Sequence, residues 1–291
     1  MRTPVACAAL LVIVFVSAVA LAADQFLDST GVRIRYVDQG AGEPIVLIHG
    51  RGGDIGTWAT SGVLENLAKD HRVIALDLRG HGKSSRPHDP NQYGREMGLD
   101  IVRLLDHLAL RRAHVVGYSL GANIVAQLLT THPDRFLTAT LVASAGRFAW
   151  TTQDELLFEQ EASETERDGV SRTAILRLAP RNAPKPTDEE IKRRSEAALA
   201  NPDLDRHAIA ALLRSFRDQR IAPDEAAAVR VPTLGIAGSA DPLLVSLEDL
   251  KKLRPGLKLI VVDGATHSGD RGIVRRAEFV AAIRDFVAAR R

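Results

Sequence analysis

Short apolar runs alternate with amphipathic helical patterns along most of the chain, and this rhythm restricts the fold more than any other sequence feature. The runs are uninterrupted and contain many β-branched residues, as in strands buried on both faces of a sheet. They lie at 45–48, 73–76, 115–116, 140–143, 234–237 and 259–262. Residues 32–37 instead alternate apolar and polar side chains, which is typical of a half-buried antiparallel strand.

Helical periodicity fills the intervals between these runs. Helix candidates lie near 57–69, 92–108, 120–131, 243–253 and 272–290. In the second candidate, Leu99, Val102 and Leu105 recur at the spacing of one helix face. Alternating strands and helices predict the α/β class, with a mostly parallel sheet flanked by helices on both faces.

One long segment, residues 148–222, contains no convincing strand. It is rich in Glu, Arg, Ala and Leu, and Thr187 followed by Glu190 forms a helix-capping pattern. Four prolines punctuate it. We therefore expect a helical insertion between the sixth and seventh strands of the sheet.

Composition excludes several classes of protein. The 291 residues include 38 Lys plus Arg and 36 Asp plus Glu, a near balance that argues against a nucleic-acid binder. The single cysteine, Cys7, excludes an internal disulfide framework and a cysteine-cluster zinc site. The histidines show no ligand spacing, so we expect no metal site.

The N-terminus differs from the rest of the chain. Arg2 precedes an apolar stretch over residues 5–21, and Ala20-Leu21-Ala22 has the small-x-small pattern of a signal-peptidase site. We expect residues 1–22 to be a secretory signal peptide, with residues 23–291 exported to the periplasm or secreted. The alternative is an uncleaved anchor through residues 5–21, and only then do we expect contact with a membrane.

The clearest chemical motif is Gly117-Tyr118-Ser119-Leu120-Gly121, between an apolar run and a helical pattern. In a strand–turn–helix context this motif places the serine on strained backbone over the sheet edge, and the glycines let strand and helix approach closely. The helix N-terminus then presents N–H groups where negative charge would develop. The sequence therefore predicts Ser119 as a nucleophile.

Other polar loops also follow strand-like runs. His49 to Gly53 follows the 45–48 run and could supply a second N–H to an oxyanion, from Arg51 or alternatively Gly52, with His49 ordering the loop. Asp241 and His267 follow the last two runs. The carboxyl ends of parallel strands meet at one sheet edge, so the carboxylate is well placed to orient the imidazole.

Together these segments resemble the α/β-hydrolase family from about residue 32 to the C-terminus, with the helical insertion in the position of the family's cap. Residues 77–84 also resemble the family's loop after its fourth strand, where we expect Asp77 and Arg79 to brace the loop. The resemblance implies an α/β-hydrolase fold with eight strands, a helical cap over residues 148–222, and no cofactor.

The resemblance also implies roles for individual residues. It assigns the nucleophile to Ser119, the base to His267, the acid to Asp241, and the oxyanion donors to the Leu120 and Arg51 amides. The family's dehalogenases and epoxide hydrolases use aspartate at the elbow, so Ser119 argues against both reactions.

We therefore expect a serine hydrolase that cleaves a small or medium carboxylic ester through an acyl-enzyme. A lactonase, amidase, carbon–carbon hydrolase or cofactor-free haloperoxidase would use the same nucleophile. A non-catalytic binding scaffold is the alternative from another class.

Large side chains near the predicted site could form the pocket walls, although each could equally be core packing. The candidates are Trp58, Tyr118, Leu120, Phe148, Trp150 and Leu243, with Phe158 and Phe216 as further members. We expect the Arg51 side chain to point away from the pocket, because only its N–H is needed there.

Overall fold

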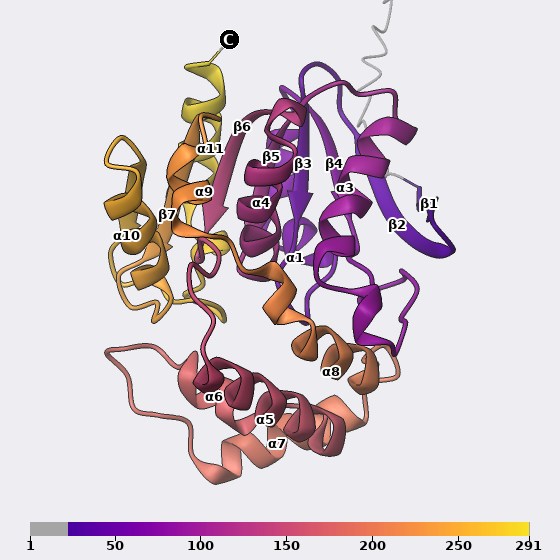
Figure 1. Ribbon diagram of the computed structural model, residues 1–291, viewed down its shortest axis with the longest axis vertical. Helices are drawn as coiled ribbons and strands as arrows, with labels where there is room; N and C mark the ends of the chain where they lie inside the picture. The colour runs from indigo at the N-terminus through magenta and orange to yellow at the C-terminus, as the bar shows by residue number, and fades with distance from the viewer. Residues whose placement is uncertain (1–22, 291) are drawn as a thin grey trace, which may run out of the picture.

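The computed structural model describes residues 23–290, and its strands form one eight-stranded sheet in the order β1-β2-β4-β3-β5-β6-β7-β8 (Figure 1). β1 and β2 pair antiparallel, β2 is antiparallel to β4, and the remaining pairs are parallel. The strands are β1 Gln25–Ser29, β2 Val32–Gln39, β3 Pro44–Ile48, β4 Arg72–Leu76, β5 Ala113–Tyr118, β6 Phe136–Val142, β7 Thr233–Gly238 and β8 Lys258–Val262. The mostly parallel sheet predicted from the sequence is confirmed.

Apolar side chains on the two faces of the sheet form separate clusters under different helices. One cluster contains residues of α3 (Arg95–His107), α4 (Leu120–Thr131) and α10 (Leu244–Leu253). The other contains residues of α1 (Gly56–Ala59), α2 (Val63–Leu67) and α11 (Ala277–Ala288). Helices cover both faces because strands in a parallel sheet are apolar on both sides.

Between β6 and β7 the described chain forms helices and adds no strand to the sheet. They are α5 Thr152–Asp168, α6 Arg172–Arg177, α7 Asp188–Leu199 and α8 Arg206–Arg214 within residues 148–222, followed by α9 Pro223–Ala228. Figure 1 shows α5, α6 and α7 grouped beyond the end of the sheet toward which the strand arrows point. This helical insertion (residues 148–222) therefore lies at the carboxyl ends of the strands.

Two local differences separate the structure from the sequence prediction. The chain forms β1 over Gln25–Ser29, where the sequence pattern predicted no strand. The single helix expected over 57–69 is two short helices, because Gly62 adopts φ +73° and interrupts the helical backbone.

The expected signal peptide, residues 1–22, lies outside the described residues. Among residues 23–290, no helix is both long and apolar enough to span a bilayer. Export of the chain stays a prediction.

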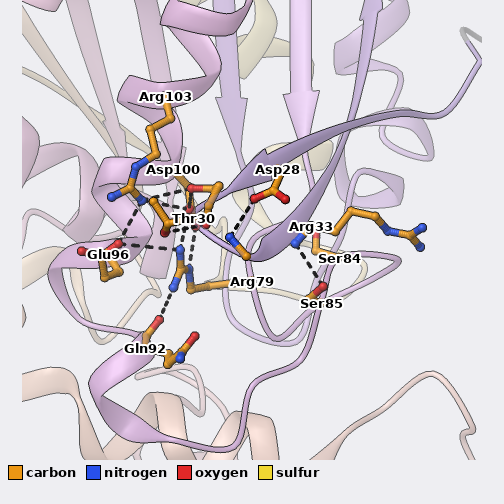
Figure 2. A network of polar contacts seen from close by, with 12 residues as sticks. Asp28, Thr30, Arg33, Arg79, Ser84, Ser85, Gln92, Glu96, Asp100 and Arg103 are labelled. Atoms are coloured by element: carbon orange, nitrogen blue, oxygen red, sulfur yellow. Dashed lines mark hydrogen bonds and ion pairs between the residues drawn. The ribbon is translucent and has the colours of Figure 1, made fainter.

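The loop after β4 is braced by buried ion pairs, as its sequence predicted. Arg79 donates two hydrogen bonds to the Asp100 carboxylate, of 2.7 and 2.6 Å, and a third to the Gln92 carbonyl. Figure 2 shows this guanidinium between Asp100, Glu96 and Gln92. Arg103 approaches Asp100 and Glu96 from the other side. The network fixes the loop to α3, near the base of the helical insertion.

Asp77 organises the other end of the same loop. Its carboxylate accepts hydrogen bonds from the backbone N–H groups of Ile55 at 2.8 Å and Lys83 at 2.9 Å, and pairs with Arg35 at 3.0 Å. These contacts connect the loops after β3 and β4, so they hold the sheet edge where the site residues lie.

Candidate active site

Ser119 lies on a strained turn between β5 and α4. Its backbone has φ 54° and ψ −110°, which is unusual for a residue with a side chain. A Cβ on Gly117 would lie 2.3 Å from the Gly121 carbonyl oxygen, and a Cβ on Gly121 would lie 2.3 Å from that of Ile48. Only glycine fits at either position, so the turn holds Ser119 out at the sheet edge.

His267 and Asp241 reach Ser119 from the loops after β8 and β7. The His267 Nε2 atom lies 3.0 Å from the Ser119 Oγ atom, although the residues are 148 positions apart in sequence. The His267 Nδ1 atom lies 2.9 Å from an oxygen of the buried Asp241 carboxylate, and the other oxygen accepts the Leu243 N–H at 2.8 Å. With Nδ1–H bonded to Asp241, Nε2 can accept the serine proton.

Tyr118 steadies His267, a contact that the sequence did not predict. Its hydroxyl donates a 2.6 Å hydrogen bond to the His267 carbonyl oxygen, and the two rings lie 5.6 Å apart. Burial raises the pKa of the Tyr118 hydroxyl, which keeps it protonated as a donor. The residue next to the nucleophile therefore helps to hold the loop that carries the imidazole.

Two backbone N–H groups are the predicted donors to an oxyanion at Ser119. The loop at Gly50 passes close to Ser119, since a Cβ on Gly50 would lie 3.1 Å from the serine Cβ. In the turns, loops and helix caps of residues 23–290, neither the Arg51 N–H nor the Leu120 N–H donates a hydrogen bond to a backbone carbonyl. Both groups are available for the oxyanion role that the sequence predicted.

His49 orders the loop that contains Arg51. Its Nδ1 atom lies 2.7 Å from the Gly50 carbonyl oxygen, and its Nε2 atom accepts the Leu78 N–H at 3.0 Å. Burial lowers the His49 pKa and keeps the imidazole neutral, as a ring that donates at one nitrogen and accepts at the other must be. The structural interpretation of His49 made from the sequence agrees with these contacts.

A cavity of about 230 Å³ opens beside Ser119, between the sheet edge and the helical insertion. Of the predicted wall residues, Tyr118, Leu120, Phe216 and Leu243 line it. Binding pockets for drug-sized ligands usually measure about 300–1,000 Å³, so this cavity suits a small ligand.

Four predicted wall residues, Trp58, Phe148, Trp150 and Phe158, do not line the cavity. Trp58 is fully buried in the core, where it stacks on Phe279 with ring centroids 6.3 Å apart. Trp150 stacks on Phe158 at 5.7 Å, and Phe148 packs against the apolar cluster under α4. These large apolar surfaces are buried by packing rather than left for a ligand.

The Arg51 side chain also differs from its prediction. It lines the cavity and forms a 3.3 Å ion pair with the buried carboxylate of Glu161 on α5, rather than pointing away. Glu161 also accepts a hydrogen bond from Arg177 of α6 and forms an ion pair with it. The buried acid draws Arg51 toward the insertion, and nothing in the sequence around position 51 predicts a partner 110 residues away.

No group of His, Cys, Asp and Glu side chains within residues 23–290 has an arrangement that could hold a metal ion.

Comparison with known proteins identifies related chains. The model of the alpha/beta hydrolase fold matches residues 43–269. The chain is 42% identical over 120 residues to 2-hydroxymuconate semialdehyde hydrolase of Pseudomonas sp. strain CF600, covering 40% of this chain and 42% of the relative. It is 26% identical over 261 residues to pimeloyl-[acyl-carrier protein] methyl ester esterase of Aliivibrio fischeri, covering 86% of this chain and 95% of the relative.

The more identical relatives are matched only in part: the first three alignments each span less than half of the relative's length. Among solved structures, a thermophilic esterase from Thermogutta terrifontis superposes with a TM-score of 0.73 at 22% identity, covering 92% of this chain and 99% of that one. This likeness concerns the fold.

Proposed function

The chain belongs to the alpha/beta hydrolase fold family and, on that premise, we propose that it is a serine hydrolase that cleaves a small carboxylic ester through Ser119, His267 and Asp241. The observation that carries the proposal is the continuous contact from the Ser119 hydroxyl through the His267 imidazole to the buried Asp241 carboxylate. A serine on a strained turn, a base within hydrogen-bond reach and an orienting acid are the parts that acyl transfer requires.

In the proposed reaction, His267 Nε2 removes the Ser119 proton as the serine oxygen attacks the ester carbonyl. The Leu120 and Arg51 N–H groups stabilise the resulting oxyanion. The imidazolium returns its proton to the leaving alcohol, which departs and leaves an acyl-serine. His267 then activates a water molecule, whose attack releases the acid and restores Ser119.

Asp241 holds the imidazole with Nδ1 protonated and stabilises its charged form during each step. Two features keep this acid in place: complete burial and the Leu243 N–H. We also infer that the helical insertion acts as the cap of the pocket, because Arg177, Leu178 and Phe216 of the insertion face the same cavity as Ser119.

A series of p-nitrophenyl esters of increasing acyl length tests the proposal. The parental protein should hydrolyse short esters, with kcat/KM falling once the acyl chain exceeds the cavity. Ser119→Ala should lose nearly all turnover while circular dichroism and the melting temperature stay close to parental. Equal activity in the two proteins would overturn the proposal. Absence of turnover with every ester, in a folded protein, would also overturn it and favour amide, lactone or carbon–carbon substrates.

A further inference from the structure

The cavity beside Ser119 has an excess of positive charge. Three arginines from separate segments line it: Arg51 after β3, Arg147 directly before the insertion and Arg177 at the end of α6. The acid paired with Arg51 and Arg177 is Glu161, which is fully buried behind the cavity wall. His267 also faces the cavity, but its carboxylate partner, Asp241, is engaged in orienting it.

Arg51 and Arg177 share the one carboxylate. Glu161 accepts a 2.9 Å hydrogen bond from Arg177 Nε, and it forms ion pairs with Arg177 Nη2 at 2.7 Å and with Arg51 at 3.3 Å. A single negative charge therefore faces two guanidinium groups. These two arginines connect the sheet edge to the insertion, which gives both of them a structural role.

Arg147 differs from Arg51 and Arg177 in its contacts. Among residues 23–290, its guanidinium forms no ion pair or side-chain hydrogen bond, and its Nε atom is buried without an acceptor. The charged group instead lies over the Phe158 ring, 4.2 Å from its centroid, and 5.6 Å from that of Phe216. The nearby acid Asp154 caps α5, where its carboxylate accepts from Thr151.

Backbone contacts hold the main chain of Arg147 in place. Its carbonyl oxygen accepts the Ile221 N–H at 2.9 Å, and Arg147 pairs as an isolated parallel bridge with Arg220. The chain entering the insertion is thereby joined to the insertion's last segment beside the cavity. Burial lowers the pKa of Arg147 to about 10, with Arg177 and Arg51 adding to the effect, so the group is still charged at neutral pH.

A half-buried cation with a buried, unpaired Nε atom is unfavourable, because its desolvation is not offset by an anion or by hydrogen bonds. A planar guanidinium held against an aromatic face has donors at its edge that match the two oxygens of a carboxylate. We propose that the substrate carries a carboxylate a few bonds from the scissile ester, and that Arg147, with Arg177 beside it, binds this group. The inference rests on the proposed esterase function and specifies its substrate class.

Two pairs of small esters test the proposal. They also distinguish a substrate with its carboxylate on the acyl side of the ester from one with its carboxylate on the alcohol side. Monomethyl glutarate and methyl pentanoate differ by a carboxylate on the acyl side. 4-Acetoxybutanoate and butyl acetate differ by a carboxylate on the alcohol side. Proton release in a pH-stat gives kcat/KM for each ester and hence the preference for the charged member of each pair.

In at least one pair, the parental protein should prefer the charged ester about tenfold or more. Arg147→Gln should lower that preference by about 10- to 100-fold, mainly through KM, because a charged hydrogen-bonded pair is lost on substrate binding. Arg147→Lys should retain part of the preference, since lysine keeps the positive charge but lacks the planar guanidinium that can donate two parallel hydrogen bonds. Arg193→Gln, a matched change on the exposed surface of α7, should leave the preference unchanged.

A preference for the neutral ester in both pairs would overturn the inference. So would a preference that survives Arg147→Gln, because Arg147 would then only stack on Phe158. If Arg147→Gln does not fold, inhibition of p-nitrophenyl butyrate hydrolysis by glutarate tests the parental protein directly. Glutarate should inhibit far better than the neutral diamide glutaramide, and equal inhibition would count against the inference.

If the proposed esterase function itself is wrong, the result differs from a failure of the carboxylate inference. In that case p-nitrophenyl butyrate shows no Ser119-dependent turnover at all. Calorimetric titration of Ser119→Ala with glutarate then still measures whether the cavity binds a carboxylate. Binding that is lost on adding Arg147→Gln supports the inference without any catalysis, and absence of binding overturns it.

Discussion

The carboxyl edge of the sheet and the helical insertion face each other across the cavity, yet they are built in different ways. At the sheet edge, Ser119, Asp241 and His267 each come directly after a strand, and backbone geometry decides where each side chain lies. On the insertion, the cavity wall depends on contacts between distant side chains, such as Arg51 with Glu161. The arrangement of Ser119, Asp241 and His267 is therefore encoded locally, whereas the opposite wall of the cavity depends on tertiary packing.

The largest expected effect falls on the sheet edge. Asp241→Asn should lower kcat by about 10⁴-fold, because the amide favours the wrong imidazole tautomer while the fold is kept. Steady-state kinetics with a short p-nitrophenyl ester measures this loss. A kcat within tenfold of parental would show that Asp241 does not orient His267.

Next in size is a change at the junction between the two regions. Glu161→Gln leaves Arg51 and Arg177 facing each other without their shared carboxylate, and breaking a buried pair in this way typically costs about 3–5 kcal/mol. We expect a lower melting temperature. The preference for carboxylate-bearing esters should rise, because the cavity becomes more positive.

Two observations would contradict that prediction. An unchanged melting temperature would mean that Glu161 does not hold the insertion against the sheet. A fall in the preference for charged esters, in protein that is still folded, would mean that Glu161 positions the arginines more than it neutralises them. Glu189→Gln, on the exposed first turn of α7, is the matched control.

A smaller effect is expected at Tyr118. Tyr118→Phe removes the hydrogen bond to the His267 carbonyl and keeps the ring, so kcat should fall by roughly 3- to 10-fold, the equivalent of one ordinary hydrogen bond. KM for a neutral ester should change less than kcat. A kcat equal to parental would show that the loop carrying His267 is held without this contact.

The smallest expected effect is a difference in acid unfolding between the insertion and the sheet. The fluorescence of the two tryptophans can follow the two regions separately. Trp58 lies in the core and Trp150 in the insertion, so Trp150→Phe and Trp58→Phe each leave a single reporter. A hydrogen bond from Arg214 holds the pKa of Glu166 below its usual range, and Thr151 does the same for Asp154.

Both acids lie on the insertion, and their stabilising effect has a defined pH window. A carboxyl group with a lowered pKa in the folded state stabilises that state above its ordinary pKa near 4, and the contribution is lost as the pH falls further. The emission of Trp150 should therefore change at a higher pH than that of Trp58. Coincident transitions would mean that the insertion and the sheet unfold as one unit.

The sequence predicted the sheet edge residue by residue because local rules apply there. The strand–turn–helix context of Ser119 and the positions of Asp241 and His267 after strands depend on near neighbours in the chain. It missed β1, whose five residues show little apolar alternation, and it missed the break at Gly62. Neither the direction of Arg51 nor the burial of Trp58 follows from a local pattern, since Glu161 and Phe279 are far away in sequence.

Covalent labelling tests the central claim, that Ser119 is an activated nucleophile, most directly. A fluorophosphonate should add once to the parental protein, and peptide mapping by mass spectrometry should place the adduct on Ser119. The adduct should be absent from Ser119→Ala and should form much more slowly in Asp241→Asn. Labelling of another residue, or equal labelling of parental and Ser119→Ala proteins, would contradict the account.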